Sequence, residues 1–175
     1  MHPMIPQIIG VAAVATFLFS YQLKRREAII ICNTLSRCLY IVQYLLLGAF
    51  SGAVLDVLGA IASVIAAKKN IPLVKKHLKT VIIIVDLTIL AVGLLLCASP
   101  IDLLPIFGVL LHTSAFWLTD ERWIRRVSLA GSPFWFVYNF SSAAYGSAVG
   151  DLLTMLSIFV AMIRYRAGKN NEKSA

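Results

Sequence analysis

The sequence predicts an all-α membrane protein of seven transmembrane helices, in which two parallel three-helix repeats are joined by a linker helix. Three observations support this fold class. Of 175 residues, 59% are hydrophobic and 14% are charged, and the mean hydropathy is +0.84. Apart from Arg37, Lys and Arg lie in short clusters between long apolar runs or at their ends. The segment "AFSGAVLD", which starts at Ala49, is similar to "AYGSAVGD", which starts at Ala144.

This composition separates the chain from several classes of protein. Soluble domains carry about 25% charged residues. A net charge of +8 suits nucleic-acid binding, but the basic residues do not follow one face or one helix, so we expect no nucleic-acid partner. The three cysteines lack metal-site spacing, and the sequence has no HExxH motif, glycine-rich phosphate loop or Ser/His/Asp grouping. We therefore expect no metal, no cofactor and no enzymatic activity.

Long apolar runs predict the individual helices. A hydrocarbon core of about 30 Å requires roughly 20 helical residues, and the alternating pattern of a membrane barrel strand is missing. Runs that reach or approach this length lie at 5–23, 28–50, 52–67, 80–98, 103–119, 124–145 and 147–165. The third and fifth are the shortest, and the third follows the second with hardly a turn between them.

Positive charge predicts the orientation of these helices. Clusters of Lys and Arg follow the first, third, fifth and seventh runs, and the other connections carry none. The clusters are Lys24, Arg25 and Arg26; Lys68, Lys69, Lys75, Lys76 and Lys79; Arg122, Arg125 and Arg126; and Arg164, Arg166, Lys169 and Lys173. Because basic loops stay in the cytoplasm, we expect an outside N-terminus and a cytoplasmic C-terminus, with a short basic tail at 166–175.

An internal repeat explains why similar segments recur. An offset of 95 pairs Asp56 with Asp151 without a gap, and an offset of 98 pairs "IIGV" from Ile8 with "IFGV" from Ile106. Three helices are an odd number, so one linker helix is needed to give both copies the same orientation. We therefore divide the single transmembrane domain, 1–175, into repeat one at 5–67, a linker at 80–98 and repeat two at 103–165.

This plan resembles the SWEET and PQ-loop superfamily and the PnuC vitamin transporters. Four sequence features are more specifically similar to the YgjV-type bacterial inner membrane proteins: "QYLLLGAFSGA" at 43–53, "LLPIFG" at 103–108, "FWFVYNF" at 134–140, and Arg164. The resemblance implies a multi-pass protein of the bacterial inner membrane, and it implies a homo-oligomer as one possible assembly. In repeat-built transporters the substrate site lies near the midplane, where the repeats meet.

Polar side chains at helical spacing predict where such a site lies. Ionisable residues within membrane spans usually face the protein interior or a cavity, and the acids of the two repeats match in position. The predicted substrate-binding residues are Arg37, Tyr40, Gln43, Tyr44, Asp56, Trp135, Tyr138, Asn139 and Asp151. Asp56, His112 and Asp151 are candidates for proton coupling, and Pro105 and Pro133 are candidate hinges.

Structural roles compete with each of these functional roles. The glycines near Asp56 also suit close helix packing, and Arg37 can form an ion pair with Asp56 or Asp86. His112 can be a hydrogen-bonded structural residue, and the aromatic residues can simply pack. Asp56 and Asp151 also lie about one and a half turns from the outer helix ends, within reach of interfacial water.

The interpretation that unites these features is a transporter or facilitator of a small polar molecule, working by alternating access at a midplane site between the repeats. With three acids and one arginine in the spans, a neutral or cationic solute is easier to accommodate than an anion. The alternative is a membrane receptor or assembly partner on the same scaffold, whose basic loops engage anionic lipid or another protein. The lipid bilayer is a partner in both cases.

Overall fold

The chain folds into helices joined by short connections over the residues that the structure describes. This computed structural model describes residues 4–23 and 25–172, and their side chains except at 121 and 161–172. Within this part of the chain there is no strand. The elements are α1 (Met4–Gln22), α2 (Arg26–Leu47), α3 (Phe50–Ala67), α4 (Pro72–Lys76), α5 (Leu78–Leu95), η1 (Pro100–Asp102), α6 (Leu103–Trp117), α7 (Glu121–Ser141) and α8 (Tyr145–Glu172).

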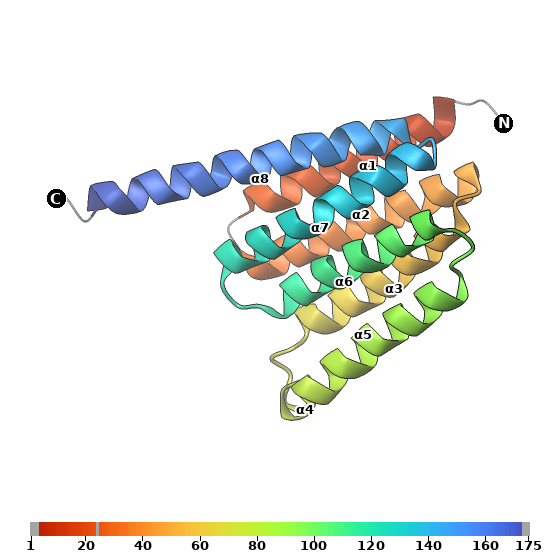
Figure 1. Cartoon of the computed structure of the whole chain (residues 1–175). Coiled ribbons are helices and arrows are strands. Elements are labelled where there is room, and N and C mark those ends of the chain that lie inside the picture. Colours follow the sequence, from red (N-terminus) through yellow and green to blue (C-terminus); the bar gives the residue numbers. More distant parts are fainter. Residues whose placement is uncertain (1–3, 24, 173–175) are drawn as a thin grey trace.

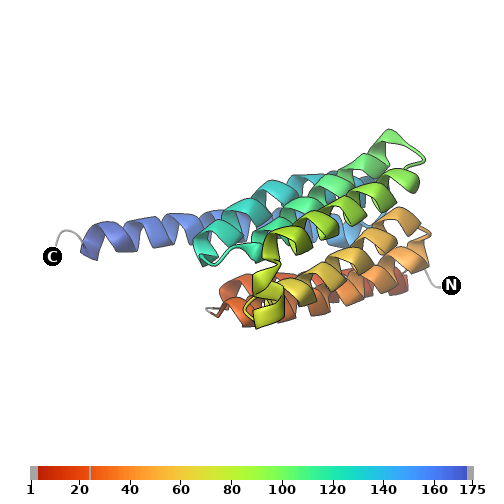
Figure 2. The same ribbon diagram turned by 90° about the horizontal axis from the view of Figure 1, so that it is seen from below.

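The long helices lie side by side along a common direction (Figures 1 and 2). Among the described residues, five helices are long and apolar enough to cross a membrane, namely α1, α2, α3, α5 and η1 continued by α6. Helix α7 begins with a basic segment, and the apolar part of α8 covers Tyr145–Val160. The predicted all-helical membrane architecture is confirmed at this level.

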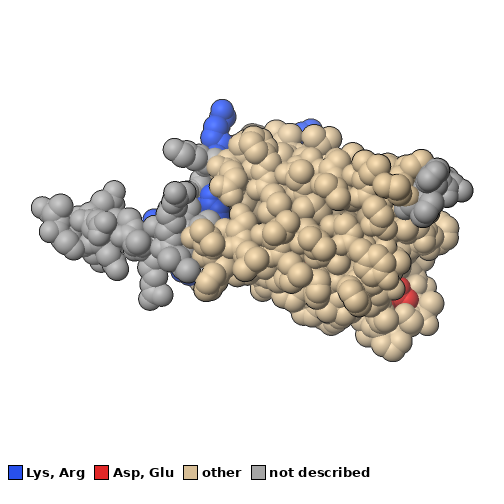
Figure 3. Space-filling model, turned by 90° about the horizontal axis from the view of Figure 1, so that it is seen from above, with Lys and Arg blue, Asp and Glu red and all other residues tan. Residues whose placement is uncertain are grey.

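Charge is segregated to the ends of the bundle. Figure 3 shows a broad face without charged side chains, with Lys and Arg gathered at one end and an acidic side chain at the opposite end. Large apolar side chains cover the outside of the helices, among them Ile8, Ile31, Ile84 and Leu156, which are each more than half exposed. An apolar belt between charged ends is what a lipid bilayer requires of the surface that it surrounds.

Six of the long helices form a closed ring. Helix α2 packs between α1 and α3, and α7 packs between α6 and α8. The two groups of three meet along two lines, because α3 packs against α6 and α8 packs against α1. Helix α5 lies outside the ring against α3 and α6, and only its Ile89 and Gly93 are buried. The interior of the ring is therefore formed jointly by the two groups.

The turns that follow α2 and α7 have the same geometry. Gly48 has a φ of 73° and Ala143 has a φ of 57°, and both values lie in the left-handed region that closes a helix C-terminus. In each turn the next amide bonds back over the same distance: Ala49 N to Tyr44 O at 2.9 Å, and Ala144 N to Asn139 O at 2.9 Å. The two turns lie 95 residues apart, the offset of the sequence repeat.

Several predicted boundaries change for identifiable reasons. The span predicted at 28–50 ends at Leu47 because Gly48 closes the helix, and α3 starts at Phe50 rather than at position 52. The basic connection after α3 contains the extra short helix α4, which begins with Pro72 at a position that needs no amide donor. Helix α8 continues to Glu172 rather than ending at 165. The side chains of the predicted basic tail, 166–175, lie outside the described residues.

Candidate functional site

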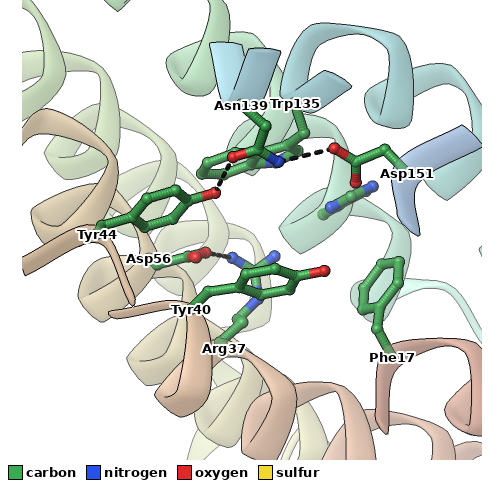
Figure 4. Close-up of a pocket in the computed structure, with 9 residues that line it drawn as sticks. Phe17, Arg37, Tyr40, Tyr44, Asp56, Trp135, Asn139 and Asp151 are labelled. Atoms are coloured by element: carbon green, nitrogen blue, oxygen red, sulfur yellow. Dashed lines mark hydrogen bonds and ion pairs between the residues drawn. The ribbon is translucent and has the colours of Figure 1, made fainter. Parts of the chain in front are cut away.

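A small polar cavity lies inside the ring, between the two groups of helices (Figure 4). Each of the six ring helices contributes at least one lining residue: Phe17 from α1, Arg37, Tyr40 and Tyr44 from α2, Asp56 from α3, His112 from α6, Trp135 and Asn139 from α7, and Asp151 from α8. The cavity measures about 20 Å³, which is room for about one water molecule. A larger solute can enter only if the helices move apart.

Helical spacing positions the lining residues of α2 and α7. Arg37, Tyr40 and Tyr44 follow one another at steps of three and four, and Trp135 and Asn139 are four apart. Residues at these steps lie above one another on one face of a helix. These residues form a polar stripe along each of the two helices, and both stripes point into the ring. The other faces of the same helices carry exposed apolar residues such as Leu35 and Val137.

A chain of hydrogen bonds crosses the cavity from one half to the other. Tyr44 Oη donates to Asn139 Oδ1 at 2.6 Å, and Asn139 Nδ2 donates to Asp151 Oδ2 at 2.7 Å. All three side chains are buried. Because the Tyr44 hydroxyl uses the amide oxygen, the amide nitrogen of Asn139 is directed to Asp151. The carboxylate is thus held by one oxygen, and its other oxygen points into the cavity (Figure 4).

Arg37 and Asp56 form a buried ion pair beside this chain. Arg37 Nη1 lies 2.6 Å from Asp56 Oδ1, and both side chains are almost fully buried. The pair corresponds to one of the structural roles considered above, with Asp56 rather than Asp86 as the partner. A Cβ at Gly59 would come within 2.9 Å of Arg37 Cζ, so this glycine makes room for the guanidinium. Asp86 on α5 does not line the cavity.

Aromatic rings form one wall of the cavity. Tyr40 and Tyr44 are nearly parallel, with ring centroids 6.1 Å apart and planes 18° apart. Tyr44 and Trp135 are also 6.1 Å apart, with planes 14° apart. The edge of Tyr138 packs against both Tyr44 and Trp135. Aromatic rings next to carboxylates give the cavity two chemical features that attract positive charge.

Gln43 and Tyr138, which were predicted to bind substrate, do not line the cavity. They close the end of the ring at which the described residues include no Lys or Arg. Ser147 Oγ donates to Gln43 Oε1 at 2.5 Å, and Gly52 N donates to Tyr138 Oη at 2.8 Å. At an offset of 95, Gln43 corresponds to Tyr138 and Gly52 to Ser147. Each half therefore presents the same position of its middle helix to the same position of the other half's third helix.

The remaining predicted residues occupy well-defined places. His112 lines the cavity, and its Nε2 lies 2.9 Å from the Ser128 carbonyl oxygen, which can only accept, so Nε2 carries the proton. Pro133 lies inside α7, where it removes a backbone donor. Pro105 lies in the first turn of α6, where the amides need no partner from within the helix.

Two cations that the sequence analysis placed only in basic clusters, Arg26 and Lys69, close the opposite, basic end. Arg26 donates to Ala66 O at 2.8 Å, to Phe116 O at 2.5 Å and to Leu118 O at 3.1 Å. Lys69 Nζ donates to Trp117 O at 2.8 Å and to Leu118 O at 3.0 Å. Both side chains therefore neutralise carbonyls at the C-terminal end of α6. Burial lowers the pKa of Lys69, and the charge of Arg26 lowers it further.

A ring of apolar helices with ionisable side chains turned inward defines a polytopic α-helical membrane protein. The model of the Imp-YgjV family, described as bacterial inner membrane protein, matches residues 4–169, so the chain belongs to this family. It is therefore a multi-pass protein of the bacterial inner membrane. No curated protein matches the chain, and no solved structure does. The relation to the SWEET, PQ-loop and PnuC proteins stays a prediction.

Proposed function

We propose that this protein is a transporter or facilitator of a small polar molecule, with seven spans arranged as two three-helix repeats around the central cavity. The observation that carries the proposal is that all six ring helices contribute to one buried polar cavity between the halves. Polar groups buried at membrane depth usually belong to a solute or ion pathway. The matching turns and cross-contacts of the two halves support the repeat arrangement.

Alternating access requires that two different sets of contacts break in turn. At one end, Gln43–Ser147 and Tyr138–Gly52 join the halves. At the basic end, Arg26 and Lys69 join the first half to the last carbonyls of α6. In this mechanism the cavity opens outward when the first set separates and opens to the cytoplasm when the second set separates. Rocking of α1–α3 against α6–α8 accomplishes both movements.

A reversible cross-link tests this mechanism. Cys32, Cys38 and Cys97 are first replaced by Ala, and Gln43→Cys is then combined with Ser147→Cys. Proteoliposomes are screened for uptake of sugars, nucleosides and amines. Oxidation of the cysteine pair is expected to stop uptake of the transported solute, and reduction is expected to restore it, because the link holds the two halves together at one end.

The matched control places a cross-link within one half. Ser36 Oγ donates to Ala13 O at 2.9 Å, so Ala13→Cys with Ser36→Cys joins α1 to α2. Oxidation of this pair is expected to leave uptake intact. Failure of the protein to take up any solute of the panel, together with binding of anionic vesicles or another protein through its basic end, would favour the receptor or assembly role instead.

A further inference from the structure

The charges that face the cavity do not balance. Among the described lining residues, Arg37 is the one permanent cation, and Asp56 and Asp151 are the acids. Arg37 is paired with Asp56. The printed side-chain partner of Asp151 is the neutral Asn139. Among the described lining residues, the one permanent cation is thus taken by Asp56, and none is left for Asp151.

Comparison of the two halves locates the missing charge. At the repeat offset of 95, Asp56 corresponds to Asp151, and Arg37 corresponds to Ser132. Ser132 is buried and donates to Ser128 O at 3.1 Å, so it offers no charge to Asp151. The first half thus contains an internal ion pair, and the second half contains the acid alone. The halves differ in charge at the position where a ligand would meet both of them.

The other groups near Asp151 cannot supply the charge. Asn139 is neutral and bonds to one carboxylate oxygen. His112 gives its Nε2 proton to the Ser128 carbonyl, and its neutral imidazole carries no charge. A buried carboxylate that has no cationic partner is unfavourable in a low dielectric, so it takes up a proton or a cation. The cavity is therefore suited to a single added positive charge.

The aromatic wall indicates an organic cation rather than a metal ion. Tyr40, Tyr44 and Trp135 present nearly parallel rings to the space that Asp151 faces. Ring faces attract ammonium and guanidinium groups, and Trp does so best. A metal ion instead needs several oxygen, nitrogen or sulfur ligands, and the described residues contain no group of three His, Cys, Asp or Glu side chains that could hold one.

We propose that the cavity binds a small organic monocation, whose charge pairs with Asp151 and whose apolar part packs on Tyr40, Tyr44 and Trp135. This inference rests on the transport function proposed above and narrows its substrate class. The ligand takes the place in the second half that the Arg37 guanidinium takes in the first. A proton on Asp151 is the competing occupant, so binding of the cation releases a proton wherever Asp151 is protonated beforehand.

Binding measurements on the purified protein in nanodiscs test this assignment without requiring transport. The probes are tetramethylammonium, choline and guanidinium at constant ionic strength, with 3,3-dimethylbutan-1-ol as the uncharged isostere of choline. At least one cation is expected to bind and to raise the unfolding temperature, whereas the alcohol is not. Asp151→Asn is expected to weaken cation binding at least about 30-fold, as expected when a buried charge loses its partner.

Three further variants separate the site from general stability. Asp86→Asn removes an acid that lies on α5 outside the cavity, and it is expected to leave cation affinity unchanged. Ser132→Lys places a cation at the position equivalent to Arg37, and it is expected to abolish binding in protein that remains monodisperse. Trp135→Phe is expected to weaken cation binding less than Trp135→Ala does.

The outcomes distinguish this inference from the transport function. If no cation binds, or if Asp151→Asn binds cations as well as the unaltered protein does, the inference is wrong. Uptake of a neutral solute without cation binding would leave the transport function standing and overturn the substrate class. Cation binding that depends on Asp151, in a protein that moves no cation across liposomes, would support the site and overturn transport.

Discussion

Tyr44 donates a 2.6 Å hydrogen bond to the side-chain oxygen of Asn139, and the two residues occupy equivalent positions of the two halves, 95 residues apart. A residue that contacts its own repeat equivalent must lie close to the axis that relates the repeats. The bond therefore marks the centre of the ring, between the cross-contacts of Gln43 and Tyr138. Because the two equivalent residues differ in type, the centre is chemically asymmetric, with a donor from one half and an acceptor from the other.

Removal of the Tyr44 hydroxyl tests the importance of this central bond. Tyr44→Phe leaves Asn139 Oδ1 buried without its donor, and it is expected to lower the free energy of unfolding by about 1–2 kcal/mol. Equilibrium unfolding in detergent by SDS titration measures the change. Tyr145→Phe is the control, because Tyr145 is exposed on the surface and should change stability little. Equal effects of the two variants would show that the central bond adds no stability.

The Arg37–Asp56 pair predicts a strong coupling between two substitutions. Arg37→Gln leaves a buried carboxylate alone, and Asp56→Asn leaves a buried guanidinium alone, so each is expected to lower the free energy of unfolding by about 3–5 kcal/mol. The double variant removes both charges and is expected to be less destabilised than the sum of the single variants. A double-mutant cycle from SDS titrations measures the coupling. Additive effects would mean that the two charges do not interact.

The sequence predicted the interior face of α2 and α7 well because polar side chains reveal helical periodicity even in a membrane protein. Arg37, Tyr40, Tyr44, Trp135 and Asn139 all line the cavity as their spacing predicts. The matching acids also point inward from opposite sides of the ring. These positions were accessible because a polar side chain in lipid has few alternatives to the interior.

Other features could not be predicted, for physical reasons. Gln43 and Tyr138 are the chain neighbours of the cavity residues Tyr44 and Asn139. One residue along a helix turns the side-chain direction by about 100°, so these two side chains meet the neighbouring helix instead of the cavity. Phe17 carries no polar signal, because residues facing lipid and residues facing protein are equally apolar in α1. Arg26 belongs to a basic cluster in the sequence, and only the folded chain brings it to the end of α6. The order of the helices around the ring could not be predicted either, because apolar helix faces do not show which helices pack together.

Close packing of Gly52 against Tyr138 gives a third prediction. A Cβ at position 52 would lie 2.6 Å from Tyr138 Cε1, so Gly52→Ala is expected to destabilise the protein by about 1–3 kcal/mol through overpacking. The same substitution in a Tyr138→Ala background is expected to have a much smaller effect, because the clashing ring is gone. SDS titration of the four proteins measures both effects. A similar loss in both backgrounds would contradict the contact.

The cations at the basic end give a fourth prediction. Lys69→Met removes the ammonium that binds the last carbonyls of α6, and it is expected to lower the free energy of unfolding by about 2 kcal/mol, as for hydrogen bonds to charged groups. The adjacent Lys68 is exposed, so Lys68→Met is a matched control with the same loss of charge. Comparable losses in the two variants would indicate a general effect of net charge rather than a specific contact.

The segregation of charge gives a fifth prediction, which concerns orientation. The described basic residues between α1 and α2, after α3 and at the start of α7 lie at the same end of the ring, and the connection between α5 and α6 lies at the other end (Figure 1). A reporter fused after Lys173 is therefore expected to read cytoplasmic, and one inserted after Ser99 is expected to read periplasmic. Paired alkaline phosphatase and fluorescent protein fusions measure both positions, since the first is active only in the periplasm and the second only in the cytoplasm. The same compartment for both fusions would mean an even number of spans between them, so that one of α6, α7 and α8 does not cross the membrane.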